Sequence, residues 1–408
     1  MAYSINDIEI TEPWPTIVLS TKENGLALLL RHRQRPVAFL LREVPAGETL
    51  TARDLTDIVG SEIDLERFSD NDQADDQKPP SAGDLPPLTV AICSKDNSRE
   101  LSHCLTQLMS ITSGQTERFF DILVVDNAPS NNDTHELVRS LPGVRYATEP
   151  KPGLNFARNR AVQESTTELI AFVDDDVTVD RHWLTGLAKA LGEHPDAGAF
   201  TGLVLPSELV TDAQILFERR GGFEKSFKTL RYGQTLPGHP FYPCIGGKFG
   251  TGCNMAFRRS ALVKLGGFDE ALDTGPSLPG GGDTDMLYRV VRGGYPLIYE
   301  PQFLVFHRHR RDYRQLRNQY CRSWGQGLMA FVVKSYMHDT TQRSNLRRLV
   351  AWWIKHQFRE LRQSLTGNNT STPDLVLAEI WGGLVGLSIA YPRSVMRTRA
   401  VRKRFSRS

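Results

Sequence analysis

The stretch LIAFVDDDVTVD, from Leu169 to Asp180, decides how the rest of the chain is interpreted. Its first five residues form a continuous apolar run, which is typical of a strand buried on both faces of a sheet. The run ends at three consecutive carboxylates, Asp174, Asp175 and Asp176. Ligands bind at the carboxyl ends of strands in open α/β sheets, and clustered carboxylates repel one another unless they share a cation. Oxygen ligands indicate Mg²⁺ or Mn²⁺, whereas the alternative is a set of aspartates that caps the following helix.

The composition is that of a globular protein with two or three domains. The chain has 408 residues, of which 40% are hydrophobic, and a nearly balanced formal charge of +2. Its five cysteines are scattered without a CxxC pair, which favours reduced thiols over disulfides or a zinc site. The first fifteen residues lack the pattern of a secretory signal, so we expect a cytoplasmic protein. Because Glu379 interrupts the longest apolar segment, Leu375 to Tyr391, we expect no membrane-spanning helix.

The chain divides into four parts. Residues 1–68 predict a small α+β unit, in which Asn24-Gly25 forms the turn of a hairpin between the first two strands. Residues 69–87 contain five aspartates and four prolines and predict a linker. Residues 88–311 alternate strands with helices, and residues 312–408 predict a basic helical extension. Within the first part, the predicted strands are Thr16–Ser20, Leu26–Arg31 and Pro36–Arg42, and the predicted helix is Thr51–Val59.

Residues 88–311 predict a doubly wound α/β domain. Successive βαβ units require a mostly parallel sheet with helices on both faces. The chain has no G-x-G-x-x-G after the first strand and no P-loop motif, so neither a dinucleotide-binding fold nor a P-loop enzyme is indicated. Residues 201–250 are rich in glycine and predict a long loop. The predicted strands are Leu88–Cys93, Phe120–Asp126, Val144–Thr148 and Leu169–Val173, and the helices between them are Arg99–Met109, Thr134–Ser140 and Asn155–Ser165.

Polar side chains follow three of these strands and are expected to meet at one edge of the sheet. Ser94 and Asp96 follow the first strand, Asp126 follows the second, and the aspartate triplet follows the fourth. Lys151 and Arg158 add cations suited to a phosphate or the edge of a base. Taken singly, an aspartate after a strand is more often an ordinary turn residue, and the two cations are compatible with solvated helix charges.

Six motifs in a fixed order resemble those of the inverting family 2 glycosyltransferases. They extend from residue 88 to about residue 311, over half of the chain. The resemblance implies a GT-A fold and a hexosyl-type transfer from a nucleotide-diphosphate sugar to a hydroxyl of a glycan or lipid-linked acceptor, in cell-surface polysaccharide or glycolipid synthesis. It also implies a divalent cation, Mn²⁺ or Mg²⁺, at a DxD-type motif. The motifs are VAICSKDN, ILVVDNAPSNND, GLNFARNRA, AFVDDDVTVDRHWL, CNMAFRRSALVKLGGFDE and GGGDTDMLYRVVRGGYPLIYEP.

The resemblance assigns roles to individual residues. Asp126 and Arg158 would contact the nucleotide base, with Ser94, Asp96 and Lys151 in the same nucleotide-binding set. The triplet would bind ribose and the metal-bridged diphosphate, but its register stays open: Asp174 and Asp176 form a D-x-D, and Asp175 is an alternative ligand. His307, after the last strand, would complete the metal site. His307 and His309 alternate, so we expect them to point to opposite faces.

The resemblance also implies one carboxylate base, in the segment GGGDTD. The preceding residues Ser277 to Gly282, SLPGGG, predict a flexible loop that delivers the base to the start of a helix. Gly282 stands where the family usually has Glu, which leaves Asp283 as the first choice of base and Asp285 as the alternative. At a helix start these two side chains diverge by roughly 200 degrees, so only one is expected to reach the acceptor.

The composition becomes basic from Arg308 onward. A segment rich in arginine precedes an apolar helix predicted at Gly325–Tyr336. The second predicted helix, Asn345–Leu365, interleaves basic and aromatic residues, which suits peripheral contact with an anionic membrane surface. The alternative is a packed helical subdomain with a disordered basic tail. Nucleic acid is not indicated, because no recognised binding motif accompanies the charge.

Two other functions are compatible with parts of the sequence. A nucleotidyltransferase of the same general fold should carry a glycine-rich loop after its first strand, but SKDNSRE has no glycine. A catalytically inactive sugar-nucleotide-binding or scaffold protein is favoured by the missing Glu at Gly282.

Overall fold

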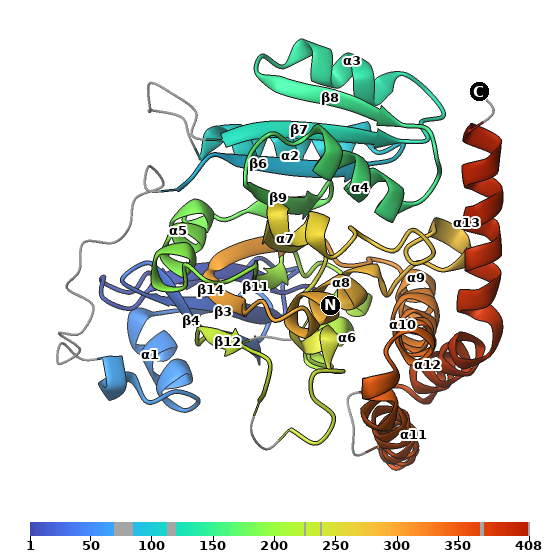
Figure 1. Cartoon of the computed structure of the whole chain (residues 1–408). Helices are drawn as coiled ribbons and strands as arrows, with labels where there is room; N and C mark the ends of the chain where they lie inside the picture. Colours follow the sequence, from blue (N-terminus) through green and yellow to red (C-terminus); the bar gives the residue numbers. More distant parts are fainter. Residues whose placement is uncertain (69–84, 112–119, 224–225, 237–238, 368–370, 407–408) are drawn as a thin grey trace.

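A nine-stranded sheet forms the centre of the computed structural model, which describes residues 1–68, 85–111, 120–223, 226–236, 239–367 and 371–406 (Figure 1). The strand order is β10-β14-β11-β13-β9-β6-β7-β8, and β12 pairs with β14. β7, β8, β9, β11 and β14 run parallel to β6, while β10, β12 and β13 run the other way. The predicted mostly parallel α/β sheet is therefore confirmed. The strands are β6 Leu88–Ser94, β7 Phe120–Asn127, β8 Val144–Glu149, β9 Leu169–Asp174, β10 Val177–Val179, β11 Ala199–Pro206, β12 Leu230–Tyr232, β13 Asn254–Arg258 and β14 Leu297–His307.

Helices cover both faces of this sheet, each over its own hydrophobic core. Apolar residues of α2, α3 and α5 pack on one face, and those of α4, α7 and α8 pack on the other. Every residue of β9 before Asp174 is buried, as the uninterrupted apolar run predicts. The bounds of these helices are α2 Ser98–Ser110, α3 Asp133–Ser140, α4 Leu154–Glu164, α5 Trp183–Glu193, α7 Arg259–Lys264 and α8 Gly282–Arg292.

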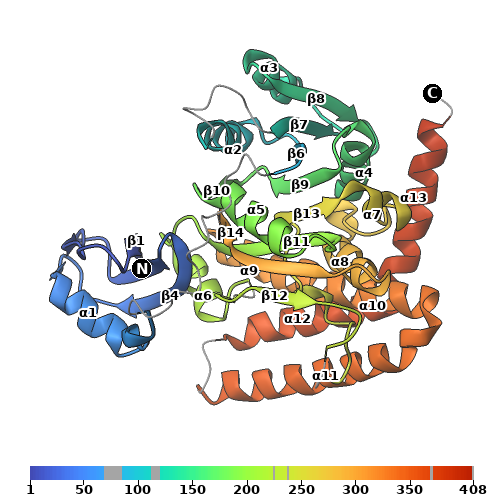
Figure 2. The same ribbon diagram turned by 60° about the vertical axis from the view of Figure 1, so that its left-hand side comes forward.

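Residues 1–68 fold around a separate core and dock against the central sheet (Figure 2). The predicted Asn24-Gly25 hairpin is wrong, because β3 pairs with β1 and β4 while β2 pairs with β5. The side chain of Arg31 is buried between Asp7, at 2.8 Å, and Asp180, at 2.6 Å, so an ion pair joins this unit to the stretch after β9. The predicted linker lies largely outside the described residues. The elements are β1 Ser4–Glu9, β2 Ile17–Val18, β3 Gly25–His32, β4 Arg35–Glu43, β5 Thr49–Leu50 and α1 Ala52–Gly60.

The glycine-rich residues 201–250 are not the long loop that the sequence predicts. They contain most of β11, the helix α6 (Asp212–Arg219) and the short strand β12. Some of the glycines mark close backbone approach instead: a Cβ at Gly202 would lie 1.7 Å from the carbonyl oxygen of Phe303.

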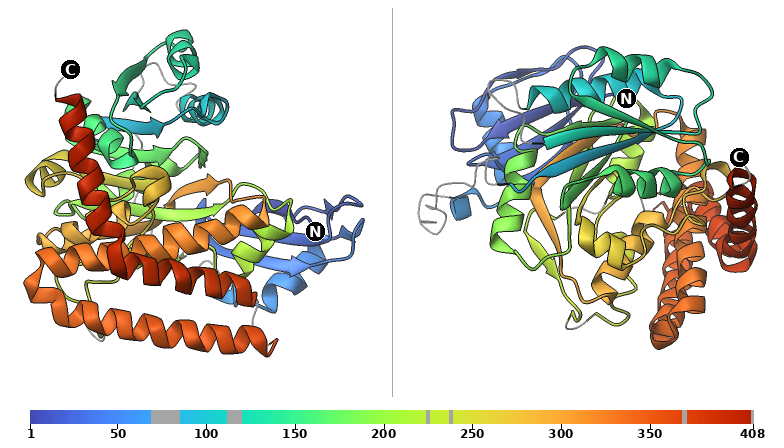
Figure 3. Two further views of the ribbon diagram at one scale, coloured as in Figure 1. Left: turned by 90° about the vertical axis from the view of Figure 1, so that its right-hand side faces the viewer. Right: turned by 45° about the horizontal axis from the view of Figure 1, so that its top comes forward.

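The C-terminal region is a layer of packed helices (Figure 3). The alternative of a disordered basic tail is wrong, because α13 is a helix whose Tyr391 hydroxyl donates to Asp269 at 2.8 Å. The continuous helical stretch Pro373–Phe405 is also long and apolar enough, with a mean hydropathy of 1.5, to cross a membrane, contrary to expectation. However, 44% of its most apolar window is buried inside the protein. The elements are α9 Tyr313–Asn318, a π-helical segment Gln319–Gln326, α10 Gly327–His338, α11 Arg343–Leu365, α12 Pro373–Val385, a π-helical segment Gly386–Ala390 and α13 Tyr391–Phe405.

Candidate active site

Two carboxylates and an imidazole converge at the carboxyl end of β9. Asp174 ends β9, Asp176 lies in the turn before β10, and His307 ends β14. In the antiparallel pairing of β10 with β14, Val177 lies opposite His307. Asp176, the residue before Val177, therefore lies close to the histidine. One ligand atom from each of Asp174, Asp176 and His307 lies within 4.8 Å of the others, and His307 Nε2 is 3.4 Å from Asp176 Oδ1. Three side chains that the sequence singled out are thus brought together.

Asp175 faces away from this cluster. Its carboxylate accepts hydrogen bonds from the Ser94 hydroxyl at 2.5 Å and from the Asn97 amide at 2.9 Å. Ser94 is the last residue of β6 and Asn97 lies in the loop after it, so Asp175 ties this loop to the end of β9. The sequence left open which two of the three aspartates would bind the metal. This geometry favours Asp174 and Asp176 over Asp175 as the ligands.

Electrostatics in the cluster favour a bound cation. Burial raises the pKa of Asp174 to about 7; Arg158 opposes this shift, and the charges of Asp176, Asp175 and Asp283 add to it. Burial also lowers the pKa of His307 to about 4, so its imidazole is neutral near pH 7, as a metal ligand must be. Carboxylate ligands suit Mg²⁺ and Mn²⁺, and a nitrogen ligand is more readily accepted by Mn²⁺. The residues present therefore fit a divalent cation.

Asp126 offers a buried acceptor that nothing in the described residues satisfies. One carboxylate oxygen accepts from the Tyr146 hydroxyl at 2.8 Å, while the other, Oδ1, is buried without a hydrogen-bond partner. Burial raises the pKa of this carboxyl. An orphaned acceptor of this kind is expected to pair with a donor from a ligand, such as the N–H of a nucleotide base. The sequence did not point to Tyr146, which lies in the exposed-edge strand β8.

The other predicted nucleotide-binding residues have partners within the protein. Asp96, with a left-handed φ of 51°, accepts a hydrogen bond from the backbone N–H of Ser130 at 2.8 Å. Lys151 forms an ion pair with Glu149 at 3.3 Å. Ser94, as described above, donates to Asp175. These contacts show that the three residues shape the edge of the sheet around Asp126.

Arg158 is buried at the centre of the site. Its guanidinium donates to Asp273 Oδ2 at 3.0 Å and to Asn155 Oδ1 at 3.2 Å. Burial alone would lower its pKa, but the charges of Asp273, Asp174 and Asp283 raise it above the ordinary value. The Arg158 guanidinium therefore interacts with three carboxylates. It lies between the metal-ligand cluster at the end of β9 and the start of α8.

Asp283 and Asp285 lie on the first turn of α8 and diverge, as expected for a helix start. Asp283 is partly buried and accepts from the Gly252 N–H at 2.9 Å. Asp285 is fully buried, accepts from Arg289 Nε at 2.8 Å and binds Lys334 Nζ. Asp285 is thus committed to ion pairs inside the protein, while Asp283 faces the cation Arg158.

Asp273 is a residue of the site that the sequence did not reveal. A Cβ at Gly282 would lie 2.3 Å from both Asp273 Oδ2 and Asn155 Nδ2, so the Asp273 carboxylate occupies the space that a side chain at position 282 would need. Burial raises the pKa of Asp273 to about 6, against the effect of Arg158. Its backbone has a left-handed φ of 52°. No local pattern distinguishes Asp273 from its acidic neighbours in FDEALD, so only the fold identifies it.

Two further expectations about the surroundings of the site need correction. The SLPGGG segment packs against the C-terminal helices: a Cβ at Gly280 would lie 2.6 Å from the Ser323 carbonyl oxygen. His307 and His309 do not point to opposite faces, because their Nδ1 atoms are 3.4 Å apart. The strand ends at His307, so alternation no longer applies beyond it. His309 is buried against Glu218 at 2.7 Å and lies outside the metal-ligand cluster.

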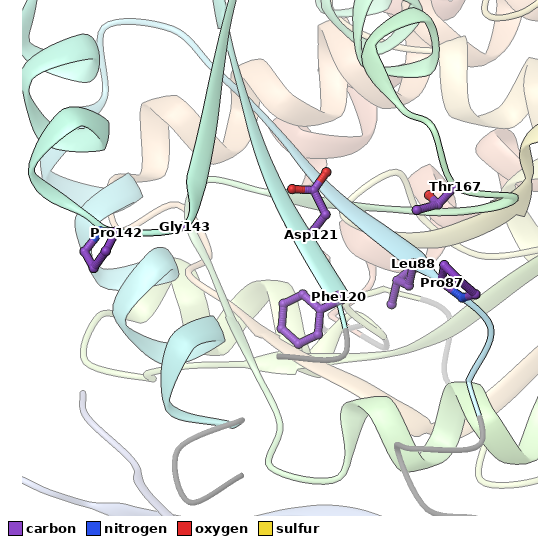
Figure 4. A pocket seen from close by; sticks show the side chains of 7 residues that line it. All are labelled: Pro87, Leu88, Phe120, Asp121, Pro142, Gly143 and Thr167. Carbon is purple, nitrogen blue, oxygen red and sulfur yellow. The ribbon is translucent and has the colours of Figure 1, made fainter. Parts of the chain in front are cut away.

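A cavity elsewhere on the sheet is not part of this site. It is lined by Leu88 and Phe120, the first residues of β6 and β7, with Asp121 and Gly143 beside them (Figure 4). The cavity therefore opens at the amino ends of the strands, whereas the carboxylates gather at the carboxyl ends.

Comparison with known proteins identifies the domain. Residues 89–266 match the model of glycosyl transferase family 2, a segment that includes the aspartate triplet and Arg158. This segment of the chain is similar to that family. The sheet, helices and C-terminal helical region of the chain are those expected of a GT-A glycosyltransferase, so the fold implied by the resemblance is confirmed.

The relatives are similar over part of their length. A pre-mycofactocin glycosyltransferase of Mycobacterium tuberculosis is 28% identical over 239 residues, which is 58% of this chain and 46% of the relative. The succinoglycan biosynthesis protein ExoM of Rhizobium meliloti is 28% identical over 53% of this chain and 65% of its own. A glucosyl-dolichyl phosphate glucuronosyltransferase of Haloferax volcanii is 22% identical over 45% of this chain and 56% of its own. The chain thus spans about half the length of the first of these relatives.

One solved structure has a weak overall likeness to this chain. It is a mannosyltransferase of Pyrobaculum calidifontis in complex with GDP-mannose and Mn²⁺, 16% identical, with a TM-score of 0.47 over 79% of this chain and 90% of that one. A likeness at this level carries no argument about substrate or metal.

Proposed function

We propose that this protein transfers a hexosyl group from a nucleotide-diphosphate sugar to a hydroxyl acceptor, with inversion at the anomeric carbon. The observation that carries the proposal is the arrangement of Asp174, Asp176 and His307 next to Arg158 and Asp283 at one edge of the sheet. The fold does not need this arrangement: buried like charges destabilise a protein unless a ligand or a cation compensates them.

The nucleotide would lie across the carboxyl ends of β6, β7 and β9. The unpaired Oδ1 of Asp126 is suited to accept a hydrogen bond from the base. Asp174, Asp176 and His307 would hold the divalent cation, Mn²⁺ or Mg²⁺, beside the diphosphate. When bound there, the cation neutralises negative charge on the diphosphate. Arg158 is too buried to stack on a base and would act through Asp174 and Asp283 instead.

Asp283 would be the general base. It accepts the proton of the acceptor hydroxyl while the hydroxyl oxygen attacks the anomeric carbon in line. The bond from that carbon to the diphosphate oxygen breaks, and the nucleoside diphosphate leaves with the electron pair. The Gly252 N–H and the first turn of α8 hold the Asp283 carboxylate in place. The presence of this partly accessible carboxylate next to the cluster favours an enzyme over an inactive scaffold.

We further propose a glycan or lipid-linked acceptor and a cytoplasmic protein that contacts the membrane peripherally. One relative bears the name of an enzyme that acts on a dolichyl phosphate-linked sugar, which supports a lipid-linked acceptor. The basic C-terminal helices support the contact with a membrane.

A thermal-shift experiment with nucleotides tests the site. UDP, GDP and their sugars, each with and without Mn²⁺, are added to the wild type and to Asp174→Asn with Asp176→Asn. One nucleotide should stabilise the wild type in the presence of Mn²⁺, by about 2.7 kcal/mol at a concentration 100 times its Kd. The double variant should lose this stabilisation, whereas Asp57→Asn, in the exposed part of α1, should keep it. Equal stabilisation of all three proteins would remove the metal-site assignment.

A further inference from the structure

Large apolar side chains are exposed mainly on the C-terminal helices. Among the described residues, nine of the sixteen exposed large hydrophobic side chains lie between residues 343 and 406, a short part of the chain. Such a concentration marks an interaction surface, since single exposed apolar residues are otherwise scattered. The most exposed include Phe358 at 67% and Trp381 at 65%. The nine are Trp352, Ile354, Phe358, Leu365, Leu377, Trp381, Leu384, Ile389 and Met396.

These side chains form stripes on two neighbouring helices, α11 and α12. Leu377, Trp381 and Leu384 recur at i, i+4 and i+7 on α12, which places them on one face. Ile354 and Phe358 do the same on α11. The two helices run antiparallel: the Gln357 amide donates to Glu379 at 2.7 Å, and Trp353 packs against Gly383. Figure 3 shows α11 at the outer edge of the molecule with α12 beside it.

The exposed charges of the C-terminal helices have one sign. On α11 and α13 every charged residue in the exposed class is Lys or Arg, within the described parts of residues 343–406. The three acids of this segment, Glu360, Asp374 and Glu379, are half-buried, and Glu379 is paired with Arg220 at 3.2 Å. The exposed cations are Arg347, Arg348, Lys355, Arg359, Arg362, Arg393, Arg399, Arg402, Lys403 and Arg404.

We propose that the apolar stripes of α11 and α12, with the surrounding cations, dock on a membrane surface that contains anionic lipids. Aromatic and aliphatic side chains next to Lys and Arg are the composition of helices that lie in the interface of an anionic bilayer. A protein partner would need an acidic surface that matches the five exposed cations of α11, whereas anionic headgroups supply this charge at any orientation within the plane.

The helix Pro373–Phe405 lies on the membrane and does not cross it. Its middle is fixed to the protein: the backbone at Gly382 packs so closely against Cys321 that a Cβ would lie 1.7 Å from the carbonyl oxygen. Glu379 is held between Arg220 and Gln357, both from outside this helix. Crossing the bilayer would break these contacts and leave a buried carboxylate and guanidinium without partners.

The docking surface is connected to the catalytic side of the molecule. On α13, the Thr398 hydroxyl donates to the Glu270 carbonyl at 3.1 Å, and Tyr391 donates to Asp269. The segment after Asp269 and Glu270 carries Asp273, which binds Arg158. The inference therefore deepens, and rests on, the proposed function: docking would hold the site beside an acceptor anchored in the same membrane.

Sedimentation with vesicles tests the surface without any need for substrate. The full chain is mixed with vesicles of phosphatidylcholine alone or with added phosphatidylglycerol, at about 0.05 M and about 0.5 M salt. We expect the wild type to sediment with the anionic vesicles at low salt and less at high salt. Phe358→Ser with Trp381→Ser should weaken partitioning about tenfold or more. The matched control is Val18→Ser with Val263→Ser, which changes exposed side chains away from this surface.

Three results would overturn the proposal. In the first, the double variant and the wild type partition equally onto the vesicles. In the second, the wild type leaves the membrane only in detergent. In the third, the wild type forms a concentration-dependent dimer in solution and the double variant does not. The last result would assign the stripes to a second copy of the chain. The Mn²⁺-dependent thermal shift with nucleotide is measured on the same preparations. A retained thermal shift without vesicle binding would reject the docking surface alone, whereas vesicle binding without a thermal shift would reject the transferase site.

Discussion

Exchanging Asp285 for Asn should destabilise the protein, whereas the same change at Asp283 should abolish turnover. Asp285 is fully buried and binds both Arg289 and Lys334, and Lys334 is itself only 9% exposed. An amide at this position leaves two cations without their counter-charge. Breaking a buried pair in this way costs about 3 to 5 kcal/mol, which for a chain of 408 residues corresponds to a fall of roughly 3 to 6 °C in the melting temperature.

The Asp283→Asn variant should behave in the opposite way. Its amide oxygen can still accept the hydrogen bond from the Gly252 N–H, so the free energy of unfolding should change by less than about 1 kcal/mol. The amide cannot accept a proton, so turnover should fall by roughly 10² to 10⁴, while the affinity for the donor stays the same.

Both variants are compared with the wild type by thermal unfolding and by release of nucleoside diphosphate from the donor. The reasoning is refuted if Asp285→Asn melts like the wild type and is inactive while Asp283→Asn remains active. That pattern would move the base by two residues along α8.

Other changes test the surroundings of the base and the cation. Asp273→Asn should lower kcat about tenfold or more with little change in KM for the donor, because Asp273 positions Arg158 and the start of α8; an unchanged kcat would contradict this role. Gly282→Ala should destabilise the protein, since its Cβ would meet Asp273, whereas Gly247→Ala, with open space around it, serves as the control and should be neutral. In metal-free protein, the pKa of Asp174 is raised above its unfolded value of 3.8 to about 7, so stability is lost as the pH rises through this interval. In urea titrations with EDTA, Asp174→Asn should therefore be more stable than the wild type above pH 7 and equally stable below about pH 4. The gain in the free energy of unfolding is at most about 4 kcal/mol, and closer to about 2 kcal/mol because the side chain keeps some contact with solvent. If Asp174→Asn is no more stable than the wild type at pH 8, the raised pKa of Asp174 in the folded protein is contradicted.

The sequence was sufficient to predict most of the GT domain. Uninterrupted apolar runs such as Leu169–Val173 are set by burial on both faces of the sheet, so they indicate strands without knowledge of their neighbours. The carboxyl ends of parallel strands share one edge, and this rule is why residues after three strands were expected together. The structure brings Asp174 and His307 to the same place at that edge.

What the sequence could not predict depends on contacts between distant segments. The direction of Asp175 is set by hydrogen bonds from Ser94, at the end of β6, and from Asn97, which follows that strand. Asp273 belongs to the site only because Gly282 leaves room for its carboxylate. Glycines in residues 201–250 suggested a loop, but Gly202 is needed where β11 passes close to the backbone at Phe303. In each case one local pattern is compatible with two structures, and tertiary contacts select between them.

The central claim is that Asp283 and the cluster at β9 transfer a sugar from a nucleotide donor. The most direct measurement is the release of nucleoside diphosphate from a panel of UDP- and GDP-sugars, with Mn²⁺ or with EDTA, by the wild type and by Asp283→Asn. The account predicts release from at least one donor by the wild type with Mn²⁺, little release with EDTA, and a loss of roughly 10²-fold or more in the variant. Release that is equal in the two proteins, or no release from any donor by a wild type that binds nucleotide and Mn²⁺, would contradict it.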